Sequence, residues 1–61
     1  MFAVQRNDTD EYYQPGGTWG SRGTAERISY EFVYMIRAQM EEELGVPCSV
    51  ISLYEDETVP S

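Results

Sequence analysis

The sequence lacks several residue types on which chemistry in small proteins usually depends. It contains no histidine and no lysine, and Cys48 is its only cysteine. A single cysteine cannot form an internal disulfide, and without histidine no Cys/His metal site can be built. The usual nucleophile and base pairs need histidine, and Schiff-base chemistry needs lysine. We therefore predict a protein that is not an enzyme and that uses no cofactor and no metal.

Positive charge is scarce as well. Eleven acidic residues face four basic ones, all arginine, and the formal net charge is −7. Because contacts with phosphates need a basic patch, this balance argues against direct binding of nucleic acid or of an anionic membrane surface. It favours a basic protein as the partner. No apolar run approaches the length of a signal peptide core or a membrane span, so we expect a cytoplasmic protein.

The chain of 61 residues is also short of core. A domain of this size buries only about 60% of the surface that its unfolded chain exposes. Its stability is therefore expected to be marginal or to be shared with a second copy, and a homodimer is one expected state.

One segment, from Thr24 to Gly45, has strong helical periodicity. Its apolar residues recur at i, i+3 and i+4, which indicates an amphipathic helix. Thr24 is a suitable N-cap, and Gly45 before Pro47 supplies a left-handed exit followed by a helix breaker. The expected core face consists of Ala25, Ile28, Phe32, Val33, Ile36, Met40 and Leu44.

Three further segments have the composition of strands. Residues 2–6 alternate, residues 11–14 follow an Asx-rich turn, and residues 47–54 are rich in β-branched side chains. The pattern predicts a single small α+β domain over 1–54, a ββαβ unit with the helix on one face of a short antiparallel sheet in spatial order 2-1-3. An alternative omits 11–14 and leaves two strands. Residues 55–61 are expected to form an acidic flexible tail.

The last strand is apolar on both sides. Ser49, Ile51 and Leu53 are assigned to the helix side. Val50 and Tyr54, with Ala3 of the first strand, are then expected on an uncovered sheet face that is available for a dimer contact.

The glycine-rich stretch 15–23 is expected to be a loop, and it has no phosphate-binding motif. Its tryptophan, Trp19, either folds back over the core, which is the favoured interpretation, or stands out as a contact for a partner.

The predicted topology places the turn after the first strand at the same end as the helix C-terminus. Carboxylates from both segments should therefore gather there, with no base beside them, and present a negative field to basic surfaces. Tyr30 and Tyr34 are expected on the helix face opposite the core. Solvated glutamates and ordinary surface tyrosines are the structural alternatives. The candidate partner-binding residues are Asp8, Asp10, Glu11, Trp19, Tyr30, Tyr34, Glu41, Glu42 and Glu43.

These observations predict a small acidic interaction protein that binds a basic protein surface, including one that itself binds nucleic acid. It would act as an inhibitor or adaptor of the kind that phages and mobile elements encode. The alternative is a structural subunit that forms a homo-oligomer through its open sheet face.

Overall fold

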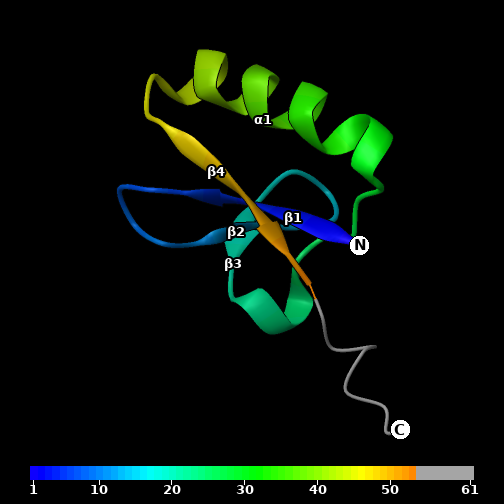
Figure 1. Ribbon diagram of the computed structural model, residues 1–61. Helices are drawn as coiled ribbons and strands as arrows, with labels where there is room; N and C mark the ends of the chain where they lie inside the picture. The colour runs from blue at the N-terminus through cyan, green and yellow to red at the C-terminus, as the bar shows by residue number, and fades with distance from the viewer. Residues whose placement is uncertain (54–61) are drawn as a thin grey trace, which may run out of the picture.

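The computed structural model describes residues 1–53 (Figure 1). The predicted tail at 55–61 and the predicted position of Tyr54 lie outside the described residues. One helix, α1 (Tyr30–Leu44), lies over an antiparallel sheet, and a short 3-10 helix, η1 (Arg22–Thr24), lies on the other side of that sheet (Figure 1). The predicted α+β class is confirmed.

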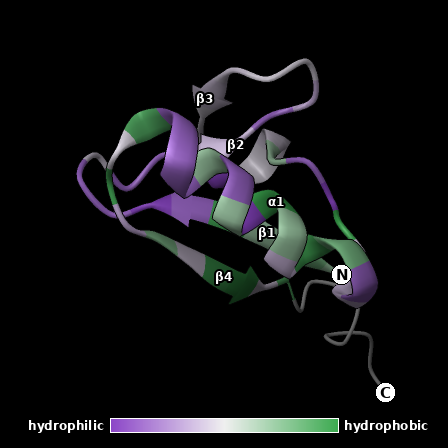
Figure 2. Ribbon diagram, turned by 90° about the horizontal axis from the view of Figure 1, so that it is seen from above, coloured by the Kyte–Doolittle hydropathy of each residue, from purple (hydrophilic) through white to green (hydrophobic). Residues whose placement is uncertain are grey.

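The sheet has four strands in the order β3-β2-β1-β4. They are β1 (Phe2–Arg6), β2 (Tyr12–Tyr13), β3 (Trp19–Gly20) and β4 (Cys48–Ser52). The predicted order of the three expected strands is correct, and the extended segment around residues 11–14 does contribute a strand. Trp19–Gly20 adds an edge strand that the glycine-rich composition concealed. Figure 2 shows α1 lying over β1 and β4, with the β2–β3 hairpin to one side.

The register of β1 and β4 decides which side of the last strand faces α1. Val4 lies opposite Val50, and both belong to the core beneath the helix, together with the buried Cys48. Directly opposed residues of an antiparallel pair project to the same face. The assignment of Ser49, Ile51 and Leu53 to the helix side is therefore wrong. Both faces of β4 carry apolar residues, so alternation alone could not choose between them.

The second face of the sheet is not open as predicted. Ala3 and Leu53 are both buried, and neither belongs to the core cluster under α1. The segment around η1 lies on this side (Figure 1). The expectation that Val50 and Ala3 form an exposed dimer surface is therefore wrong.

The helix begins five residues later than the periodicity indicates, because its N-cap is Ser29 and not Thr24 and its first residue is Tyr30. Ile28 instead forms an isolated bridge with Phe2, with a 2.8 Å hydrogen bond from each backbone N–H to the other residue's carbonyl. β2 pairs with β1 only at Gln5, so the edge of β1 near Phe2 is available to bind residue 28. These backbone bonds hold the segment before Ser29 extended, against its helical pattern.

The core face of α1 is the predicted one except at Phe32. Val33 is fully buried, and Ile36, Met40 and Leu44 pack around it. Phe32, assigned to the core from the sequence, is 51% exposed, so that assignment is wrong. At the C-terminus Gly45 has φ 73°, and its N–H donates to the Glu41 carbonyl at 2.8 Å. The predicted left-handed cap is confirmed.

Candidate protein-binding face

Much of the exposed surface of α1 is formed by two neighbouring rows of residues at i, i+4 spacing. Every residue in both rows is exposed. The rows are Tyr30, Tyr34, Ala38 and Glu42, and Glu31, Met35, Gln39 and Glu43. Rows at this spacing form the ridges by which helices pack against other helices. We call these eight residues the outer face.

The N-terminal half of the outer face is apolar and aromatic. Tyr30 is 65% exposed, Tyr34 is 47% exposed and Met35 is 59% exposed. The rings of Tyr30 and Tyr34 stand edge to face with centroids 5.6 Å apart, and Phe2 supports Tyr30 at 5.7 Å. Both tyrosines are exposed as expected, but the contact of Tyr30 with Phe2 of β1 places Tyr30 at the flank of the helix and not opposite the core. They are ordered by their neighbours and still present much of their surface to solvent.

Met35 was missed in the sequence analysis, and Phe32 was placed in the core. Met35 follows Tyr34 directly in the sequence and therefore lies in the neighbouring row of the helix surface. Its exposure could have been inferred from the outward position of Tyr34. The buried stripe of α1 consists of Val33, Ile36, Met40 and Leu44, and Phe32 is exposed on the side of this stripe away from Tyr34. Its position becomes visible only when Val33 is known to mark the centre of that stripe.

Arg37 lies at the edge of the outer face and is held within the protein. Its guanidinium is 5.7 Å from the centre of the Tyr34 ring, and its Nη1 is 4.0 Å from Glu41 Oε2. Glu41 has a structural task as well, because the same Oε2 accepts a 2.9 Å hydrogen bond from the backbone N–H of Cys48. This bond ties the last turn of α1 to the first residue of β4. Glu41 thus differs from Glu42 and Glu43, which are exposed.

The only cysteine lies beside this contact. Burial raises the pKa of the Cys48 thiol, and the negative charge of Glu41 raises it further. A buried thiol with a raised pKa stays protonated at neutral pH and is a poor nucleophile. Cys48 is therefore a packed residue and not a reactive one.

The predicted acidic end exists, but two arginines partly neutralise it. Asn7 donates its N–H to the Pro47 carbonyl at 3.0 Å, so the first turn does lie beside the C-terminus of α1. However, Arg6 donates to both carboxylate oxygens of Asp8, at 2.8 and 2.9 Å. The Arg6 hydrogen bonds lower the pKa of Asp8. The expectation that no base lies beside these carboxylates is therefore wrong for Asp8 and, through Arg37, for Glu41.

Two other acidic candidates, Asp10 and Glu11, belong to the turn itself. Asp10 has φ 64° and donates its N–H to the Arg6 carbonyl at 2.9 Å, while the Glu11 carbonyl accepts from the Arg6 N–H at 2.9 Å. Both residues are exposed. Their backbones close the hairpin, and contact of their carboxylates with a partner stays a prediction.

Trp19 covers the core, as the favoured interpretation predicted. It packs edge to face on Tyr13 with ring centroids 5.7 Å apart, and the Arg6 guanidinium lies 5.3 Å from its ring centre. The indole is thereby half-buried between β2, β1 and the core. Contact of Trp19 with a partner stays a prediction.

Comparisons of this chain with family models, with curated proteins and with solved structures return no match. Within residues 1–53, no three acidic or cysteine side chains are grouped so as to hold a metal ion. No helix in the same range is both long and apolar enough to cross a membrane. The outer face must therefore be interpreted from its own chemistry.

Proposed function

We propose that this protein is a small acidic, non-catalytic interaction protein that binds a basic protein surface through the outer face of α1. The observation that carries the proposal is the composition of that face. Exposed aromatic and methionine side chains occupy its first half, and the exposed carboxylates of Glu42 and Glu43 occupy its end.

The apolar half supplies contact area. Tyrosine and methionine are enriched at protein interfaces, and tyrosine is among the residues that dominate binding energy when it is enclosed by a partner. A contiguous apolar patch on so small a domain costs solubility unless it is used. Tyr30 and Tyr34 keep their rings in place through Phe2 and Arg37, so little conformational entropy is lost on binding.

The acidic half of the outer face gives the preference for a basic partner. Glu42 and Glu43 lie in the last turn, where the helix macrodipole disfavours negative charge by a few tenths of a kcal/mol. The net charge of −7 adds a long-range field that attracts cations and speeds their association. Arg37 over Tyr34 shows within the chain how a guanidinium binds to these rings. The complementary partner is an amphipathic segment with apolar residues followed by arginine or lysine.

Such a contact makes the protein an inhibitor or adaptor, since it covers a basic surface that would otherwise bind another anion, nucleic acid included. Proteins of this kind are typical products of phages and mobile elements. A cytoplasmic location belongs to the same proposal.

Affinity capture at low and high salt, with matched charge variants, tests the proposal. Glu42→Lys changes the outer face, whereas Glu26→Lys changes the net charge by the same two units away from α1. We expect the wild type and Glu26→Lys to capture the same basic protein at low salt and to release it at high salt. Glu42→Lys and Tyr34→Ala should lose it.

Chemical-shift mapping on the labelled protein then locates the captured partner. Shifts confined to the outer face support the proposal. It would be refuted by a Glu42→Lys variant that binds with unchanged affinity and salt dependence, or by shifts centred away from α1.

The second candidate is a homo-oligomer, and the exposure of Tyr30, Phe32 and Met35 is the observation in its favour. The contact would have to use α1, because Ala3 is buried and Val50 packs under the helix. Light scattering separates the two candidates. A homo-oligomer of this acidic chain should become tighter as salt screens its self-repulsion, whereas a complex with a basic partner should weaken.

A further inference from the structure

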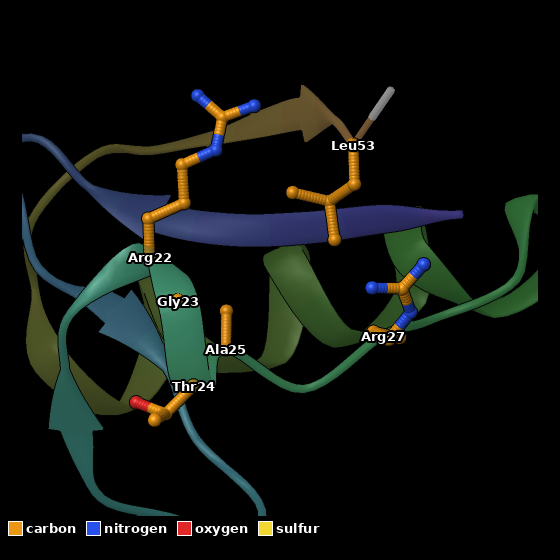
Figure 3. Close-up of a pocket in the computed structure, with 6 residues that line it drawn as sticks. All are labelled: Arg22, Gly23, Thr24, Ala25, Arg27 and Leu53. Atoms are coloured by element: carbon orange, nitrogen blue, oxygen red, sulfur yellow. The ribbon is translucent and has the colours of Figure 1, made fainter. Parts of the chain in front are cut away.

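A pocket of about 600 Å³ is lined by η1, which lies on the side of the sheet away from α1 (Figure 1), and by neighbouring residues. Its volume is within the range of small-molecule sites. In Figure 3 the guanidinium of Arg22 lies above the Ala25 side chain, the guanidinium of Arg27 lies to the right of it, and the Leu53 side chain lies between the two arginines. The lining residues are Arg22, Gly23, Thr24, Ala25, Arg27 and Leu53.

Backbone hydrogen bonds hold the wall of this pocket in place. η1 ends where the Ala25 N–H donates to the Arg22 carbonyl at 3.1 Å, and the Glu26 N–H donates to the Tyr13 carbonyl at 2.8 Å. The bridge of Ile28 with Phe2 then anchors the segment to β1. Arg22 therefore reaches the pocket from η1, and Arg27 reaches it from the extended segment that delays the start of α1.

The chemistry of the lining combines cations with an apolar floor. Two of the four arginines of a strongly acidic chain line this pocket. Arg22 Nη2 donates to the Ser52 carbonyl, a neutral acceptor, over a long 3.4 Å. A guanidinium presents several N–H donors in one plane and matches the two oxygens of a carboxylate or phosphate. Leu53 is buried and Ala25 is half-buried, so the space between the arginines has apolar walls.

We propose that this pocket binds a compact organic anion, an apolar ring or short acyl group that carries a single carboxylate or phosphate. The oxyanion is held by Arg22 and Arg27, and the apolar body lies against Ala25 and Leu53. This site is independent of the outer face of α1, and its failure would leave the proposed function standing.

The anion has two sources of the same chemistry. One is a separate small molecule. The other is the chain itself, because Glu55, Asp56 and Glu57 follow Leu53 closely in the sequence. A variant with all three residues changed to the corresponding amides removes the internal source and leaves the pocket residues unchanged.

Titration of the labelled full-length protein with phenyl phosphate tests the proposal, with inorganic phosphate and phenol as matched probes that each lack one half of the ligand. We expect saturable shifts of the Gly23, Ala25 and Leu53 amides with phenyl phosphate, and affinities at least about tenfold lower for the two half-probes. Arg22→Gln and Arg27→Gln should each weaken binding by about tenfold. Arg37→Gln, the same charge change on α1, should leave it unaltered.

A steric variant gives a second measure. A Cβ added at Gly23 meets no atom within 4 Å, and the residue does not have a positive φ, so Gly23→Leu should keep the fold and occupy the pocket. It should abolish the phenyl phosphate shifts. The proposal is overturned if phenyl phosphate binds no better than inorganic phosphate, or if Arg37→Gln weakens it as much as Arg22→Gln. Binding that appears only in the triple amide variant identifies the chain's own carboxylates as the source of the anion, whereas equal binding by the wild type and the triple amide variant identifies a separate small molecule.

Discussion

Replacing Val33 by alanine should destabilise the protein far more than the same change at the adjacent Phe32. Val33 is fully buried between α1 and the sheet, whereas Phe32 is 51% exposed. Val33→Ala removes two buried methyl groups, at about 0.8 kcal/mol each, and leaves a cavity that a helix pinned to β1 and β4 cannot close. We expect a total loss of about 2–3 kcal/mol from a stability that is about 3–9 kcal/mol for a chain of this length.

Phe32→Ala removes a larger side chain but should cost less than about 1 kcal/mol. Half of the ring is already in water, and solvent fills the space that it vacates. Alanine improves helix propensity by a similar few tenths of a kcal/mol at both sites, so the difference between the variants isolates burial.

Urea unfolding followed by far-ultraviolet circular dichroism measures both free energies, and the m-value reports whether the native state stays compact. Equal destabilisation by the two substitutions, or a larger effect at Phe32, would show that α1 is rotated about its axis relative to the arrangement described here.

Three further predictions concern the junction of α1 with β4 and the first turn. Glu41→Ala should lower the free energy of unfolding in urea by about 1–2 kcal/mol, because it leaves the Cys48 N–H without its acceptor. Glu43→Lys should keep that free energy unchanged or raise it by about 0.3–1 kcal/mol, because the helix dipole favours a cation at the C-terminus. Equal effects of the two substitutions would contradict the structural role of Glu41. The pKa of the Cys48 thiol in the folded state is raised above its ordinary value of 9.0, so the free energy of unfolding should fall as pH rises beyond about 9. Cys48→Ala should flatten that decline. The native protein should also react slowly with iodoacetamide until urea unfolds it. Arg6 lowers the pKa of Asp8 below 3.8, so wild type should be more stable than Asp8→Asn at neutral pH, and this difference should vanish as acid protonates the carboxylate. A difference in stability that persists in acid would rule out the ion pair as its cause.

Local chemistry was enough to predict several features of this protein. Gly45 before Pro47 ends the helix as predicted, because only glycine adopts the left-handed conformation there without strain. The strands at 2–6 and 48–52 were predictable from β-branched and alternating residues. The exposure of Tyr30 and Tyr34 followed from helical periodicity alone.

Tertiary contacts decided the remaining features. The helix starts at Tyr30 because the unpaired edge of β1 captures Ile28, a long-range backbone contact that local propensity does not encode. The side of β4 that faces α1 follows from the pairing of Val4 with Val50, since both sides of that strand are apolar in sequence. The pocket lined by Arg22 and Arg27 forms where η1 is followed by the segment that the same contact holds extended. The outer face of α1 combines rings with carboxylates because the contact between helix and sheet centres on Val33. Composition determined that the protein is small, acidic and without histidine or lysine. Which of its surfaces are available to bind was decided only when the strands paired and the helix packed on them.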